Sequence, residues 1–127
     1  MNTLFWIGRI LFAMIFIASG LAHLTRREAM AAYAEAKGIA AAGTMVPLTG
    51  LMIIAGGLSV LLWSWVDVGA WLLVLFLFAA AFRMHAFWKE KDEAARQLEM
   101  AHFMKNMALA GAAIVFYVLY QWPELAI

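Results

Sequence analysis

The sequence predicts an all-α membrane protein, folded as an antiparallel bundle of four transmembrane helices. Three observations favour this fold class. Of the 127 residues, 67% are hydrophobic and 13% are charged, whereas a soluble domain carries about 45–50% apolar and about 25% charged residues. Four separate apolar stretches approach the length of about 20 residues that a helix needs to cross the hydrocarbon core. The two long connections between these stretches are polar.

The composition also excludes several classes of function. The chain has no cysteine, which excludes disulfides, thiol catalysis and cysteine-held iron–sulfur clusters. The formal net charge of +1 gives no reason to expect a nucleic-acid partner. No carboxylate or thiolate joins the three histidines within a helix, so the sequence predicts no dedicated metal site.

The first predicted crossing covers residues 3–24 and is interpreted as a retained helix rather than a cleaved signal peptide. No Lys or Arg precedes its apolar run, and the run is longer than the core of a signal peptide. Residues 26–37 predict a short interfacial helix. Its apolar members fall on one face, so we expect this helix to lie along the membrane surface.

The second and third predicted crossings, residues 45–62 and 66–88, are nearly continuous. One helix over both would be about 66 Å long, twice the thickness of the hydrocarbon core. The chain must therefore reverse near residues 63–67, where Ser64 and Asp67 predict a capping box that opens the third crossing. Arg83 does not prevent insertion of this crossing, because the apolar residues around it contribute more than one arginine costs.

The fourth crossing is predicted at residues 103–122, after a connection over 89–102 that also has helical composition. We therefore expect short amphipathic helices in both long connections and a single membrane domain over residues 1–127. Both long connections are predicted to be cytoplasmic and both termini to face the outer, periplasmic side, by the positive-inside rule. The six cationic residues of the connections are Arg26, Arg27, Lys37, Lys89, Lys91 and Arg96.

Polar side chains in or near the apolar stretches are the candidate site residues, because ionisable groups are costly inside a bilayer. The interiors of the predicted crossings contain no Asp or Glu. An inward-facing cation therefore needs water, a lipid phosphate, a backbone carbonyl, or a ligand with an anionic or carbonyl group. The candidate residues for binding a ligand such as a quinone are Arg83, His85, Trp88, His102, Lys105 and Asn106, with Arg9 and His23 as further intramembrane polar residues.

Two kinds of role remain open for these residues. Two facing imidazoles can hold a haem, and one imidazole can hydrogen-bond a quinone carbonyl or relay protons. Quinone and haem are both compatible with the candidate residues, and the sequence requires neither. The alternative is structural: the three intramembrane cations extend to lipid headgroups, and the histidines bond headgroups or loop backbone.

The most specific motif pair is His85-Ala86-Phe87-Trp88, followed after a polar connection by His102-Phe103-Met104-Lys105-Asn106. Further matching elements are Gly8-Arg9, Ser19-Gly20, Lys37-Gly38, Pro47, Gly50 and Gly56-Gly57. With these residues the chain resembles the DoxX family of small bacterial four-helix membrane proteins over nearly its whole length. Two positions depart from the family pattern: Ile53 stands where a Glu is usual, and His23 stands where Lys is frequent.

The resemblance implies a bacterial cytoplasmic membrane and a link to respiratory or sulfur redox systems, since the family is named for a subunit associated with quinol oxidation. The first hypothesis is therefore an accessory or anchoring subunit of a quinone-linked membrane redox system, with a redox protein as partner. The second is a structural scaffold that docks a soluble partner through the two connections. The third is a small-molecule or anion carrier, which would require a homo-oligomer because four helices are few for a transporter.

Overall fold

The computed structural model describes residues 2–126, and these residues form helices, turns and short connections without a strand. Four segments are long and apolar enough to cross a membrane, which confirms the prediction of an all-helical chain with four candidate crossings. The α-helices are α1 (Thr3–Thr25), α2 (Arg27–Ala36), α3 (Ala42–Leu62), α4 (Val66–Met84) and α5 (Glu93–Gln121), and the short 3-10 helices are η1 (Phe87–Lys89) and η2 (Pro123–Ala126).

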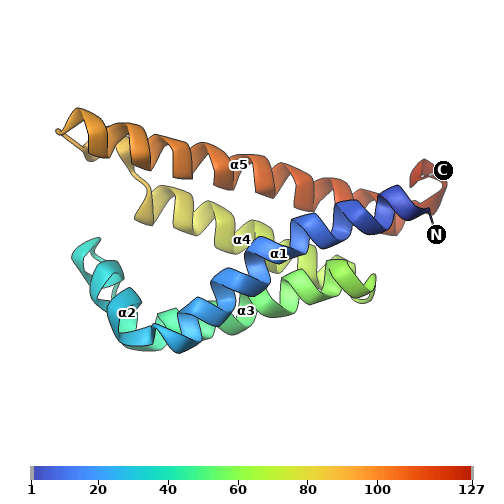
Figure 1. The fold of residues 1–127 in the computed structure, drawn as a ribbon, viewed down its shortest axis with the longest axis horizontal. Helices are drawn as coiled ribbons and strands as arrows, with labels where there is room; N and C mark the ends of the chain where they lie inside the picture. Colours follow the sequence, from blue (N-terminus) through green and yellow to red (C-terminus); the bar gives the residue numbers. More distant parts are fainter. Residues whose placement is uncertain (1, 127) are drawn as a thin grey trace.

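The long helices are arranged as two pairs. Helix α1 packs along α3, α4 packs along α5, and contacts between α3 and α4 join the two pairs (Figure 1). Both termini and the α3–α4 turn lie at one end of the molecule, here named the terminal end. Helix α2 and residues 85–92 lie at the opposite end, here named the connection end. All long polar segments of the chain are therefore gathered at one end.

Helix α5 differs most from its predicted boundaries, because it begins at Glu93 rather than near residue 103. The second amphipathic segment is therefore not a separate short helix but the first turns of α5. The helix is capped by Asp92, whose Oδ2 accepts a hydrogen bond from the backbone N–H of Ala95 at 3.0 Å. Hydropathy locates only the apolar part of this helix, which begins near residue 103. Because no Gly or Pro lies between residues 93 and 103, the helix also includes the polar residues before that point.

The turn between α3 and α4 also differs from prediction. Its N-cap residue is Trp65, and no side chain caps α4, so the expected capping box is wrong. The turn instead ends α3 with a Schellman motif, in which Ser64 N–H donates to Ser59 O at 3.0 Å and Trp63 takes the left-handed conformation (φ 56°). The Trp63 ring is held in place by contacts with Phe5 and Tyr120.

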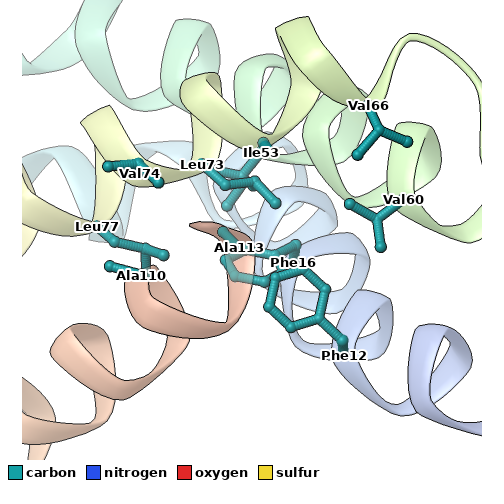
Figure 2. Close-up of a cluster of buried hydrophobic side chains, with 11 residues drawn as sticks. Phe12, Phe16, Ile53, Val60, Val66, Leu73, Val74, Leu77, Ala110 and Ala113 are labelled. Atoms are coloured by element: carbon teal, nitrogen blue, oxygen red, sulfur yellow. The ribbon is translucent and has the colours of Figure 1, made fainter. Parts of the chain in front are cut away.

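One hydrophobic core joins all four long helices near the middle of the molecule (Figure 2). Ile53 of α3 is completely buried in it. Close helix contacts depend on glycines, since a Cβ atom on Gly20 of α1 would lie 2.7 Å from the Gly50 carbonyl oxygen of α3. The labelled core residues in Figure 2 are Phe12, Phe16, Ile53, Val60, Val66, Leu73, Val74, Leu77, Ala110 and Ala113.

Candidate functional site

A cavity of about 560 Å³ at the connection end is lined by residues of both helix pairs and of α2. This volume is within the range of small-molecule pockets. Its apolar wall includes Met45, Val46, Phe76, Ala79 and Ala80. Its polar lining comes from every α-helix: Ser19, His23, Tyr33, Thr49, Arg83, Lys105 and Asn106, together with His85 directly after α4.

Helix α2 forms part of the cavity wall. Its residues Met30 and Ala34 line the cavity and pack against Val46 of α3 and Met84 of α4. Part of the apolar face of α2 is thus used for packing within the protein, and its position relative to the membrane surface stays a prediction. The opposite side of α2 stays exposed.

Glu99 of α5 is the centre of a hydrogen-bond network beside the cavity. Its side chain is largely buried, and its Oε2 lies 2.7 Å from His85 Nδ1. Its Oε1 accepts a hydrogen bond from the Tyr33 hydroxyl at 3.2 Å and lies 3.6 Å from Lys37 Nζ. Lys37 also pairs with Glu90 Oε1 at 3.3 Å. The network therefore ties α2 to the α4–α5 pair at the connection end.

The protonation of Tyr33 of α2 and of Lys37, which directly follows α2, depends on their surroundings. Burial raises the pKa of the Tyr33 phenol, and the negative charge of Glu99 raises it further against the opposing charge of Lys37. Burial alone would lower the pKa of Lys37, but its hydrogen bond to Glu90 and the charge of Glu99 outweigh burial and raise it. At neutral pH Tyr33 is therefore a neutral donor and Lys37 a cation.

His23 of α1 is anchored to α3 on the opposite side of the cavity. Its Nδ1 lies 3.0 Å from the carbonyl oxygen of Val46 and 3.2 Å from Thr49 Oγ1. The Thr49 hydroxyl in turn donates to the carbonyl of Met45 at 2.7 Å. These bonds fix the orientation of the imidazole ring.

Three further predicted residues border the same cavity. Arg83 Nη2 donates to the carbonyl oxygen of Gly38 at 3.2 Å, which joins α4 to the α2–α3 connection. Asn106 is 4% exposed and forms no side-chain hydrogen bond within residues 2–126. Lys105 is more exposed and contributes a third polar group to the lining. The structure thus brings His23, Arg83, His85, Lys105 and Asn106 together.

Two predicted residues do not line the cavity. His102 lies beside His85, with ring centroids 5.0 Å apart and ring planes 30° from parallel. Trp88 is half exposed and packs with Phe82 and Phe103. His102 therefore adjoins His85 outside the cavity lining, and Trp88 belongs to an aromatic cluster of its own. No group of three or more metal-ligating side chains is formed in the described part of the chain.

Arg9 lies apart from the cavity, towards the terminal end, and is completely buried. Its three guanidinium nitrogens have no hydrogen-bond partner among residues 2–126. The guanidinium carbon lies 3.9 Å from the centroid of the Trp6 ring, with Phe5 and Trp63 at 5.2 and 5.4 Å. Arg9 is therefore surrounded by aromatic rings in cation–π contact, away from the cavity that the other candidate residues border.

Sequence reasoning missed Glu99, Tyr33 and Lys37. Glu99 was assigned to a connection because the fourth crossing was placed at residue 103, whereas it lies within α5. A signal was available: Glu99, His102 and Asn106 are three and seven residues apart, which places them on one face of a helix. Tyr33 on α2 and Lys37 directly after it are four residues apart, a spacing that also places two residues on one side of a helix.

A family model described as DoxX matches residues 4–86, which is nearly two thirds of the chain. The matched segment contains α1 to α4 and His85, and it ends before Glu99 and the other site residues of α5. No curated protein and no solved structure matches the chain.

Proposed function

The chain belongs to the DoxX family of membrane proteins, and we propose that it binds a quinone-type amphiphile as an accessory subunit of a membrane redox system. The cavity at the connection end is the observation that supports this proposal. It combines an apolar wall with a group of fixed hydrogen-bonding side chains. A quinone or quinol has matching parts, namely a flat ring with two oxygens and an apolar tail.

The polar lining suits oxygen-bearing rings. Asn106 has an amide without a partner in residues 2–126, and Lys105 adds a cation at the cavity wall. Each group can donate to a ring oxygen, and each such bond would contribute about 0.5–3 kcal/mol, more for the charged donor. The His85 ring is held in place at the cavity wall by Glu99. The ring would lie against Phe76, Ala79 and Ala80, which are part of the apolar wall.

An accessory role follows from the chemistry of the chain. It has no cysteine with which to hold an iron–sulfur cluster or to carry out thiol exchange. In this proposal electrons enter or leave the bound quinone through a partner protein, and this chain supplies the lipid-facing binding site. The connection end, which is rich in charged side chains, is the proposed side for the partner.

We further propose that the chain crosses the bacterial cytoplasmic membrane as an antiparallel bundle, with the connection end in the cytoplasm. The absence of native cysteine permits a direct test with Ser64→Cys at the terminal end and Lys91→Cys at the connection end. A membrane-impermeant maleimide should label Ser64→Cys on intact cells and Lys91→Cys only after permeabilisation. The reverse pattern would contradict this orientation.

The binding proposal is tested with the full chain reconstituted in lipid nanodiscs. Quenching of tryptophan fluorescence would measure binding of a short-tailed benzoquinone and naphthoquinone in both redox states. Asn106→Leu should weaken binding about tenfold, the equivalent of one hydrogen bond. Trp71→Phe, outside the cavity, is the control and should leave affinity unchanged. Absence of saturable binding to the unsubstituted chain, or full affinity in Asn106→Leu, would contradict the proposal.

A further inference from the structure

The two histidines that line the cavity are both engaged through Nδ1. His85 Nδ1 lies 2.7 Å from a carboxylate oxygen of Glu99, and His23 Nδ1 lies 3.0 Å from the carbonyl oxygen of Val46. Carboxylate and carbonyl oxygens only accept hydrogen bonds, so each Nδ1 must carry the hydrogen. In a neutral imidazole the other nitrogen, Nε2, is then an acceptor.

The second contact of His23 agrees with this assignment. Thr49 Oγ1 lies 3.2 Å from His23 Nδ1, and its hydroxyl has two carbonyl acceptors in reach, Met45 at 2.7 Å and Val46 at 3.1 Å. The lone pairs of Thr49 Oγ1 are therefore the part that faces His23. Both neighbours of His23 Nδ1 are acceptors, and Nδ1–H is the donor.

Charges of both signs lie near His85: the Glu99 carboxylate favours a proton on the ring, and the cations nearby oppose one. The negative charge of Glu99 is already balanced by Lys37 at 3.6 Å, and Tyr33 donates a further hydrogen bond to it. Arg83 and Lys105 add positive charge at the cavity, and His102 lies with its ring centroid 5.0 Å from that of His85. An additional proton on His85 would place one more cation among these groups.

The Nε2 atoms of the two histidines are accessible. Within residues 2–126 the only enclosed side-chain nitrogen or oxygen atoms without a partner belong to Arg9. Neither His23 Nε2 nor His85 Nε2 forms a hydrogen bond within this part of the chain, and both residues line the cavity. The cavity therefore receives two hydrogen-bond acceptors, one from α1 and one from the end of α4.

We propose that these two acceptors set the ligand class, so that the site favours the hydroxylated quinol form over the quinone. This inference rests on the proposed function and specifies its ligand. A quinol hydroxyl can donate a hydrogen bond to Nε2. A quinone oxygen can only accept hydrogen bonds, so it would face the acceptor Nε2 without a hydrogen between them. The donors Arg83, Lys105 and Asn106 do not discriminate, because the oxygens of both forms accept hydrogen bonds.

The test compares three ligands with the same ring and tail: the quinol, the quinone and the quinol dimethyl ether. Binding is measured anaerobically to the full chain in nanodiscs at pH 8. The quinol should bind at least tenfold more tightly than the other two. Saturable binding with the quinone equal to or tighter than the quinol would overturn this inference and leave the proposed function standing. Failure of all three to bind saturably would overturn the proposed function as well.

Two substitutions at His85 separate the acceptor from the contact with Glu99. His85→Asn retains an N–H group near the Nδ1 position and has no atom at the Nε2 position, so the preference for quinol should fall at least fivefold. His85→Gln places an amide near the Nε2 position and should restore part of the preference. Trp71→Phe, at a half-exposed residue outside the cavity lining, is the control that should keep it in full. Retention of the full preference in His85→Asn would contradict the assignment.

Nitrogen-15 spectra of histidine-labelled protein test the tautomer without any ligand. At pH 8 the Nε2 atoms of His23 and His85 should resonate as unprotonated ring nitrogens, with hydrogens on both Nδ1 atoms. Assignment follows from the loss of single signals in His23→Gln and His85→Gln. A hydrogen on Nε2 of both residues would overturn the inference even if the quinol binds.

Discussion

The connection end and the terminal end hold basic side chains within membrane-spanning helices in opposite ways. At the connection end each engaged group has an oxygen acceptor, as His85 has Glu99 and Arg83 has the carbonyl of Gly38. At the terminal end Arg9 is completely buried, and aromatic rings take the place of acceptors.

This difference shows that burial of a charge does not by itself identify a binding site. Acceptors at the connection end fix one edge of each side chain and leave another edge open to a cavity. The aromatic surroundings of Arg9 provide about 0.5–2 kcal/mol per cation–π contact and leave no accessible nitrogen. The connection end is thus suited to recognition, and the terminal end to packing.

Removal of Glu99 should produce the largest effect at the connection end. Glu99→Ala leaves His85, Tyr33 and Lys37 without their shared acceptor. The free energy of unfolding should fall by about 3 kcal/mol. This value is at the low end for breaking a buried ion pair, because the network borders a cavity. Denaturant unfolding in detergent measures this loss. Glu93→Ala, at the exposed start of the same helix, is the control, and equal stability of the two variants would contradict the network.

Alanine substitutions at two glycines of α1 compare helix packing at the two ends. Gly20→Ala should destabilise the protein by about 2 kcal/mol, because the new Cβ atom meets the Gly50 carbonyl oxygen and forces α1 and α3 apart. Gly8→Ala meets no atom within 4 Å and should stabilise the helix by about 0.5–1 kcal/mol. Thermal unfolding of both variants measures the contrast, and a reversed order would show that the helices pack differently.

Replacement of Arg9 tests the terminal end directly. Arg9→Met removes a buried cation without an acceptor and keeps an unbranched side chain, so the free energy of unfolding should rise by about 1–2 kcal/mol. Arg83→Met, which removes a donor from the Gly38 carbonyl, should instead lower it. A loss of more than about 1 kcal/mol in Arg9→Met would show that Arg9 has an anionic partner in the membrane.

The ionisation of Tyr33 gives the smallest and most local effect. Burial and Glu99 raise the pKa of this phenol, so Tyr33 should ionise above its ordinary value of about 10. The contribution of Tyr33 to the free energy of unfolding is fully present below the ordinary pKa of the phenol. It is lost as the pH rises through the raised pKa of the folded state. Absorbance titration of a Tyr117→Phe/Tyr120→Phe background isolates Tyr33, and Glu99→Gln should lower its pKa. No change in Glu99→Gln would contradict the contact.

Much of the fold was predictable because membrane helices are marked by apolar length alone. The four crossings and the reversal near Ser64 follow from the thickness of the bilayer. The start of α5 was not predictable from hydropathy, since its first turns are polar but still helical. This one boundary concealed Glu99, and with it the partner of His85.

The residues of the cavity were predicted in part. His23, Arg83, His85, Lys105 and Asn106 were candidates because polar groups are costly in lipid. Their assembly around one space depends on how far the two helix pairs separate, which is a property of packing and not of residue spacing. For the same reason the sequence alone did not distinguish Arg9, which is enclosed by rings, from the residues that face the cavity.

Photolabelling with a short-tailed azidoquinone tests the central claim most directly. After illumination in nanodiscs and digestion, mass spectrometry should place the label on cavity residues such as Met30, Met45 and Met84, and excess unlabelled quinol should suppress it. Labelling confined to the apolar groove of α1 and α3 around Trp6 and Leu62, or labelling that excess quinol does not reduce, would contradict a binding site at the connection end.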